Sequence, residues 1–178
     1  PVHIGHLIIA ERFCEIMALD KCLFIPSYLS PFKIEKNPII PIEIRLKMLE
    51  IAIASNPMFE IDTFEIMRQE VSYTIDTVKY LQSKYPGSEL YLLIGTDQAN
   101  DFHLGKEFKN IMSIVHLCIA KRRLEFELNM FPYELYMNSE SKQIYKLDTP
   151  IIEISSTEIR DRIKEGKSVE YMLPCDVY

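Results

Sequence analysis

Short apolar runs alternate with amphipathic stretches along the chain, and this alternation indicates the class of fold. Residues 90–94 and 115–120 are the strongest apolar runs, and residues 22–25, 59–62 and 151–154 form shorter ones. We interpret all five as strands separated by helices. Continuous apolar strands are typical of parallel sheets that are buried on both faces. The pattern therefore predicts an α/β fold, with a doubly wound parallel sheet flanked by helices on both faces.

Four stretches carry apolar residues at helical spacing and are predicted to be helices. They cover residues 6–17, residues 42–54, the segment between Thr74 and Pro86, and a last segment from about Ser156 to just before Gly166. Ile159 and Ile163 lie about one turn apart in the last helix, and we expect both to face the core.

The composition is that of one ordinary globular domain, which we expect to span residues 1–178. Hydrophobic residues make up 48% and charged residues 26% of the chain, and the net charge is −6. That charge argues against a general nucleic-acid binder or a binder of anionic membranes. No apolar run is long enough to cross a bilayer and no signal peptide is recognisable, so we expect a cytoplasmic protein.

The four cysteines are widely scattered and form no Cys-x-x-Cys pair, which argues against a zinc site. Three of them lie in apolar surroundings, so we expect small buried thiols in a reducing compartment. We predict no metal bound directly by a protein ligand set.

The segment His3-Ile4-Gly5-His6 stands at the start of the first predicted helix. Gly5 would let the backbone approach a ligand closely, and a helix N-terminus offers N–H groups and a partial positive charge to a phosphate. His3 and His6 can donate hydrogen bonds to phosphate oxygens. Two other interpretations stay open: a metal site, for which the segment supplies too few ligands, and a helix cap beside a packed side chain.

A second group of polar residues, Ser155, Ser156, Thr157 and Arg160, follows an apolar run and opens the last helix. Hydroxyls, backbone N–H groups and a guanidinium at that position could form a second phosphate cradle. Simple N-capping by the hydroxyls, with a solvated arginine, is the alternative.

Five further residues stand in loops or at helix starts where a nucleotide could bind. Lys33 and Arg122 follow predicted strands, Arg45 lies on the second helix, and Gly95 with Asp97 ends the strongest strand. Asp97 could bind a ribose hydroxyl or cap a helix. For the three cations, solvent exposure is the alternative to phosphate binding.

The two motifs, in this order, resemble the nucleotidyltransferase superfamily whose signatures are His-x-Gly-His and Ser-Ser-Thr-x-Ile-Arg. Within it the chain most resembles the bacterial nicotinate mononucleotide adenylyltransferases. The matching segments are residues 1–7, 31–33, 45–49, 72–77, 95–97 and 154–160, together with Arg122 and the tail residues 173–174 and 177–178.

The resemblance implies a Rossmann-like fold and a reaction in which the phosphate of nicotinate mononucleotide attacks the α-phosphorus of ATP. Pyrophosphate then leaves, and deamido-NAD is formed for NAD biosynthesis. It implies that His3 and His6 contact the ATP phosphates, with His6 acting on the transition state. Ser156, Thr157 and Arg160 would hold the β- and γ-phosphates, and Mg²⁺ would bridge the polyphosphate.

The resemblance also assigns the parts that surround the nucleosides. The backbone at Ser72, Tyr73 and Thr74 would bind the nicotinate carboxylate, and Lys33 would close over the site from its loop. Gly95, Asp97 and Arg122 match the ribose and nucleotide loops, Ser155 and Gly5 belong to the phosphate cradle, and Arg45 would help to bind the substrate.

Three departures from the family pattern bear on these expectations. The family begins with a strand and a Gly-Gly loop ahead of the Pro-Val-His segment, so we infer native residues upstream of Pro1. The chain has no tryptophan, and Gly105 stands where the family usually carries the one that stacks on the pyridine ring. Phe102 or His103 would stack there instead. Phe32 replaces the loop histidine.

Two rival functions remain. One is a neighbouring enzyme that uses nicotinamide mononucleotide or phosphopantetheine, although residues 72–77 argue against the latter. The other is a nucleotide-binding module that has lost catalysis. ATP and nicotinate mononucleotide are the expected partners, without nucleic acid or membrane, and a homo-oligomer is left open.

Overall fold

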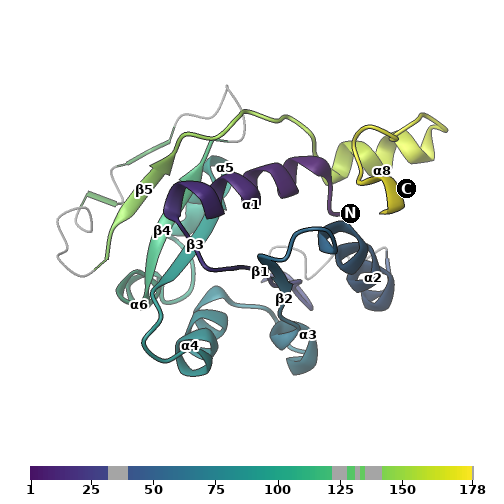
Figure 1. The fold of residues 1–178 in the computed structure, drawn as a ribbon. Helices are drawn as coiled ribbons and strands as arrows, with labels where there is room; N and C mark the ends of the chain where they lie inside the picture. Colours follow the sequence, from purple (N-terminus) through teal and green to yellow (C-terminus); the bar gives the residue numbers. More distant parts are fainter. Residues whose placement is uncertain (32–39, 122–127, 131–132, 135–141, 178) are drawn as a thin grey trace. The chain divides into compact units, whose positions relative to one another are not determined.

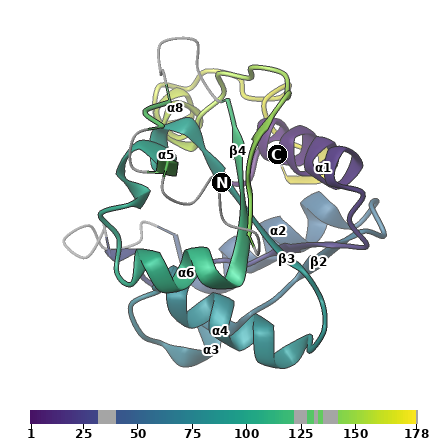
Figure 2. The same ribbon diagram turned by 90° about the vertical axis from the view of Figure 1, so that its left-hand side faces the viewer.

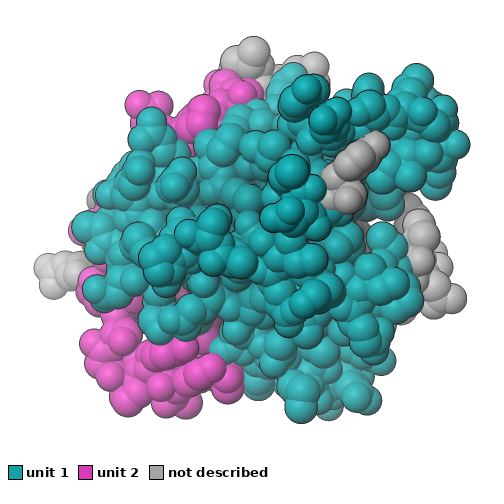
Figure 3. Space-filling view, turned by 45° about the vertical axis from the view of Figure 1, so that its right-hand side comes forward, with its two compact units in different colours: residues 1–71, 152–178 teal, residues 72–151 magenta. Residues whose placement is uncertain are grey.

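The computed structural model describes residues 1–31, 40–121, 128–130, 133–134 and 142–177. The chain divides into two compact units (Figure 3). Unit 1 comprises residues 1–71 and 152–178, and unit 2 comprises residues 72–151. That residues 1–178 form a single domain stays a prediction.

Unit 1 is built around a short pair of parallel strands. Its elements are α1 (Ile4–Met17), β1 (Cys22–Phe24), α2 (Ile42–Ile53), β2 (Phe59–Ile61), α3 (Phe64–Arg68), α8 (Ser156–Lys164) and the 3-10 helix η3 (Cys175–Val177). Cys22 of β1 lies opposite Phe59 of β2. Because α2 lies between β1 and β2 in the chain, these three elements form a strand–helix–strand unit, in which parallel pairing requires a crossover connection.

Unit 2 contains three parallel strands in the order β3-β4-β5. Its elements are α4 (Thr74–Lys84), β3 (Leu90–Gly95), α5 (Thr96–Phe102), α6 (Phe108–Ile114), β4 (Val115–Ala120) and β5 (Ile144–Leu147). Helices α4 and α6 lie side by side, as Figure 2 shows. All six residues of β4 are buried, as expected for the central strand of a covered parallel sheet.

Tyr133 anchors the core of unit 2. Its side chain is fully buried among Ala99, Phe108 and the β4 residues, and its hydroxyl donates a hydrogen bond to the carbonyl oxygen of Ala99. Burial raises the pKa of Tyr133 to about 12, so the phenol stays neutral. The hydroxyl therefore has a partner, and the ring contributes apolar contact area at no cost of a buried charge.

The predicted fold class, an α/β fold with parallel strands and helices, is confirmed. The four predicted helices correspond to α1, α2, α4 and α8, and three of the four cysteines are buried, as expected. Among the described residues, no helix combines the length and the apolar character that a bilayer crossing requires.

The predicted strand at residues 151–154 is wrong. The strand beside β4 is β5, where Ile144 lies opposite Leu117, so that edge of β4 is already occupied. Pro150 also precedes the predicted segment, and proline has no N–H to donate to a ladder. Ile154 of this segment does not pair in a strand; its side chain packs against the core cluster around Ile159.

The expectation that Ile163 faces the core is also wrong. Ile159 is fully buried, whereas 55% of Ile163 is exposed. The chain turns back at Gly166, which has a positive φ of 69°, and Val169 and Leu173 then fill the space against Ile159. The returning tail, rather than the next helical turn, therefore completes this part of the core.

Candidate active site

The start of α1 holds two imidazoles against each other. His3 is the N-cap residue and is 2% exposed, while His6 is exposed to solvent. Their ring centroids are 3.7 Å apart. A Cβ added at Gly5 would lie 3.1 Å from Nδ1 of His3 and 3.2 Å from Cγ2 of Ile152. A side chain at this position would thus press against the His3 ring and Ile152, which would have to move by a few tenths of an ångström.

The orientation of His6 is set by the backbone. The N–H of His3 donates a hydrogen bond to Nδ1 of His6 over 3.3 Å. An Nδ1 atom that accepts a hydrogen bond carries no proton, so the neutral ring carries its proton on Nε2. His6 can therefore present an Nε2–H donor to a ligand at the start of the helix.

The hydroxyls at the start of α8 have three different partners. The side chain of Ser155 accepts a hydrogen bond from the N–H of Glu158 over 3.1 Å and caps the helix. The hydroxyl of Ser156 donates to the carbonyl oxygen of Pro1 over 2.7 Å. Thr157 Oγ1 accepts from Nη2 of Arg160 over 3.0 Å. N-capping thus accounts for Ser155 but not for the other two hydroxyls.

The bond from Ser156 to Pro1 brings the starts of α1 and α8 together, and Figure 1 shows the two helices beginning side by side. Each helix N-terminus carries a partial positive charge, and Arg160 adds a full charge beside the start of α8. The N–H of Ile4 donates to the carbonyl oxygen of Met172 over 3.1 Å, so the tail fixes the start of α1. This cluster, which we call the cradle, comprises His3, Gly5, His6, Ser155, Ser156, Thr157 and Arg160.

The predicted ribose-binding residues lie at the carboxyl end of β3 in unit 2. Gly95 is the N-cap residue of α5, and Asp97 stands in its first turn. Thr96, between them, is buried. This is the edge of a parallel sheet where ligands bind. Asp97 thus lies at the ligand-binding edge of the sheet and is not the N-cap residue of α5.

The start of α4 holds the residues expected to bind the nicotinate carboxylate. Tyr73 is its N-cap residue, directly between Ser72 and Thr74. The Tyr73 ring packs against the core cluster around Ile75. Nζ of Lys106 lies 4.2 Å from the centroid of the same ring. Lys106 was not among the sequence candidates; its only signal in the sequence is its position directly after Gly105.

The two residues expected to stack on the pyridine ring are adjacent in the chain but have different surroundings. Phe102 packs edge-on against Phe108, with ring centroids 5.7 Å apart, and belongs to the core of unit 2. His103 ends α5, and its Nδ1 is buried without a hydrogen-bond partner among the described residues. The stacking role of either ring stays a prediction.

Of the three basic residues predicted to bind the nucleotides, the structure describes one. Nη2 of Arg45 donates to the carbonyl oxygen of Ser27 over 2.7 Å, so this side chain holds the loop that follows β1. Lys33 and Arg122 lie outside the described residues.

Within the described part of the chain, no group of three or more histidine, cysteine or acidic side chains lies close enough to hold a metal ion. The cradle offers imidazoles, hydroxyls and a guanidinium, which are ligands for anions.

A parallel α/β fold that brings two helix starts and an arginine together is the arrangement expected of a nucleotide-binding α/β protein. The chain belongs to the cytidylyltransferase-like family, whose sequence model matches residues 1–162. The resemblance stated from the motifs is thereby confirmed.

The sequence is similar to those of curated relatives over almost the whole chain. A protein of Desulfitobacterium hafniense (strain Y51) is 36% identical over 176 residues, which are 98% of this chain and 84% of that protein. One from Dictyoglomus thermophilum is 37% identical over 174 residues, covering 98% and 87%. Both carry the name "Probable nicotinate-nucleotide adenylyltransferase".

Solved structures agree on the fold. A Plasmodium falciparum nicotinic acid mononucleotide adenylyltransferase complexed with NaAD has a TM-score of 0.78 at 14% identity, with 99% of this chain and 88% of that chain covered. The same protein complexed with APC has a TM-score of 0.73 at 13% identity, covering the same shares.

Proposed function

We propose that this protein transfers the adenylyl group of ATP to nicotinate mononucleotide, giving deamido-NAD and pyrophosphate for NAD biosynthesis. One observation carries the proposal: the hydrogen bond from Ser156 to the Pro1 carbonyl brings the histidine motif and the Ser-Thr-Arg motif into one cluster. The names of the curated relatives identify the substrate.

In the proposed reaction, a phosphate oxygen of nicotinate mononucleotide attacks the α-phosphorus of ATP. The bond from that phosphorus to the oxygen bridging to the β-phosphorus breaks, and pyrophosphate leaves with the electron pair. No protein nucleophile is needed, so catalysis consists of positioning and charge stabilisation. Arg160, Thr157 and Ser156 hold the β- and γ-phosphates, where the leaving group gains charge.

His6 is the residue proposed to act most strongly on the transition state. Its Nε2, which carries the ring proton because Nδ1 accepts from the His3 backbone, donates to an oxygen of the reacting phosphate. A donor aimed at developing charge lowers the barrier more than it strengthens ground-state binding. His3, buried beneath it, holds the ring in place and contacts the phosphates from the same side.

Mg²⁺ is proposed to bind through the ATP phosphates, where it would neutralise part of their charge. In unit 2, Asp97 is proposed to bind a ribose hydroxyl and the backbone at residues 72–74 the nicotinate carboxylate. Lys33, Arg45 and Arg122 are proposed to add contacts to the nucleotides, and the protein is proposed to act in the cytoplasm.

The decisive experiment measures pyrophosphate release from ATP and Mg²⁺ with nicotinate or nicotinamide mononucleotide, using the protein as its gene encodes it. We expect release that depends on the acid and is much slower with the amide. Equal rates would refute the assignment of the acid as substrate. ATP binding without release would favour a binding module.

A further inference from the structure

Lys106 lies beside the start of α4, where the substrate carboxylate is proposed to bind. Its Nζ is 4.2 Å from the centroid of the Tyr73 ring, a distance typical of a cation–π contact. Tyr73 is the N-cap residue of the 11-residue helix α4. The other contacts of this ring are with the apolar core of unit 2, so Lys106 is held over a fixed platform.

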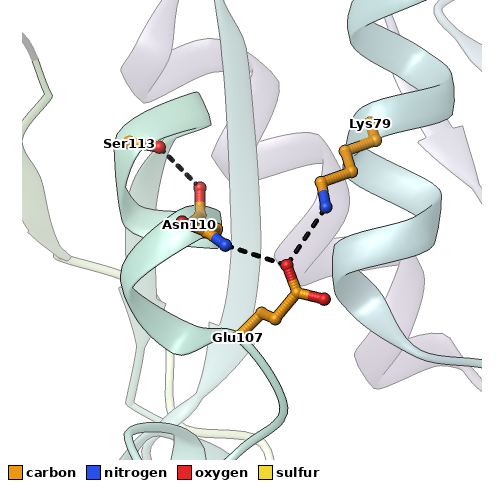
Figure 4. Close-up of polar contacts among 4 residues, drawn as sticks. All are labelled: Lys79, Glu107, Asn110 and Ser113. Carbon is orange, nitrogen blue, oxygen red and sulfur yellow. Dashed lines mark hydrogen bonds and ion pairs between the residues drawn. The ribbon is translucent and has the colours of Figure 1, made fainter.

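The carboxylate next to Lys106 in the chain, that of Glu107, is engaged by two other side chains. Oε2 of Glu107 accepts hydrogen bonds from Nδ2 of Asn110 over 2.8 Å and from Nζ of Lys79 over 3.1 Å (Figure 4). The bond from Asn110, followed by that from Lys79, holds the pKa of Glu107 below its usual value. Within the part of the chain that the structure describes, Lys106 itself makes no ion pair, although its charge also contributes to the lowered pKa of Glu107.

The backbone N–H groups at a helix start distinguish an acid from an amide only weakly. They can donate to a carboxylate oxygen or to an amide oxygen, since both accept hydrogen bonds. A fixed positive charge is different, because its attraction depends on the net charge of the ligand. A full positive charge close to the carboxylate would therefore strengthen the selection of the acid beyond what the start of α4 provides by itself.

We propose that Lys106 is that cation: a specificity-determining residue that selects the acid mononucleotide over the amide by pairing with its carboxylate. This inference rests on the proposed function, which places the pyridine ring near residues 72–74. Gly105, directly before Lys106, stands where the family usually carries a tryptophan. A stacking residue contacts the ring that the acid and the amide share, so it cannot distinguish them. The charge of Lys106 would act on the carboxylate that only the acid carries.

The test compares three variants with the unaltered protein. Lys106→Met removes the charge and keeps much of the apolar stem, whereas Lys106→Arg keeps the charge and the contact with the aromatic ring. Lys109→Met removes an exposed charge three residues further along, on α6, and serves as the matched control. Thermal unfolding followed by circular dichroism verifies that each variant is folded.

The measurement is kcat/KM for the acid and for the amide at low and high salt. We expect Lys106→Met to lower kcat/KM for the acid about tenfold, mainly through KM, and to leave the amide unchanged. Lys106→Arg should retain most of the preference, Lys109→Met should retain all of it, and salt should shrink the difference. Equal losses for both substrates, or no loss, would overturn the role of Lys106. Absence of acid-dependent pyrophosphate release by the unaltered protein would instead refute the proposed function.

Discussion

The hydroxyl of Ser156 donates a hydrogen bond to the carbonyl oxygen of Pro1, 155 positions away in the sequence, over 2.7 Å. Pro1 stands two residues before His3, the N-cap of α1, while Ser156 is the first residue of α8. This bond therefore links two helix starts whose partial positive charges add, and the bond from the N–H of Ile4 to Met172 fixes the start of α1 further. Neither motif could cradle a polyphosphate as well by itself.

Replacing Ser156 by alanine should separate the two helix starts. We expect turnover to fall roughly 10- to 100-fold, because small displacements of positioned groups are costly in catalysis. The loss of stability should stay near 1 kcal/mol, the usual net value of one hydrogen bond. Steady-state pyrophosphate release and urea unfolding give the two numbers. Ser168→Ala, which removes a hydroxyl from an exposed turn in the same unit, should leave turnover unchanged.

Replacing His6 by alanine tests the proposed charge stabiliser. We expect turnover to fall at least about 100-fold while the fold is retained, since His6 is exposed and its loss leaves no cavity. Pre-steady-state measurement of ATP binding should show a much smaller change than kcat. An unchanged kcat in a folded variant would refute the role assigned to His6.

Replacing Gly5 by alanine should disturb the cradle from beneath. The new Cβ would lie 3.1 Å from Nδ1 and 3.2 Å from Cε1 of the buried His3 ring, so that ring must move by a few tenths of an ångström. We expect turnover to drop roughly tenfold and stability by about 1–3 kcal/mol.

A loss of stability could by itself lower the activity of the Gly5 variant. Its control is therefore a variant that loses a similar amount of folding free energy at a position outside the cradle. Gly87 has a φ of 84° and open space around its Cα, so Gly87→Ala strains the backbone without a steric clash. We expect a comparable loss of stability with full turnover. A parallel fall in activity in both variants would show that the effect of Gly5→Ala is merely one of folding.

The sequence predicted the long elements because periodicity reports burial directly. Residues 115–120 form a continuous apolar run and become β4, the fully buried central strand. The short elements α3, α5, α6 and β5 were missed, since four to seven residues hold at most two turns or one edge strand. Their apolar residues pack in a pattern that depends on neighbours far away in the chain.

The same limit applies to the candidate site. The two motifs could be recognised from residue types, and the structure places both in one unit. The partners of Ser155 and Thr157 lie three residues further along the same helix, but that of Ser156 could not be predicted, because Pro1 is 155 positions away in the sequence. Lys106 was missed for the same reason: its contact with Tyr73 crosses 33 positions of sequence.

His116 provides a prediction about pH that does not involve the cradle. Its buried ring stacks on Tyr91 with centroids 4.7 Å apart, and Nδ1 accepts a hydrogen bond from the N–H of Gln143 over 3.1 Å. Burial, followed by the nearby charge of Lys142, lowers the pKa of His116 below 6.5, against an opposing effect of Glu89. Protonation of Nδ1 would also break the bond from Gln143.

The sign of the effect follows from proton binding in the two states. Between the lowered pKa of the folded state and about 6.5, the unfolded chain binds more protons at His116 than the folded protein does. The contribution of His116 to the free energy of unfolding is therefore fully present above pH 6.5, and it is lost as the pH falls through the folded-state pKa. Urea unfolding between about pH 5.5 and 7.5, where carboxylates contribute little, should show stability rising with pH.

His116→Asn should flatten that slope, because asparagine offers an acceptor near the position of Nδ1 but does not titrate. His103→Asn is the matched control, since it removes another histidine of unit 2 that stands outside the sheet, at the end of α5. We expect His103→Asn to retain the part of the slope that depends on His116. An equally steep slope in His116→Asn would show that the pH dependence arises from other groups. Burial of this imidazole would then contribute little to the dependence of stability on pH.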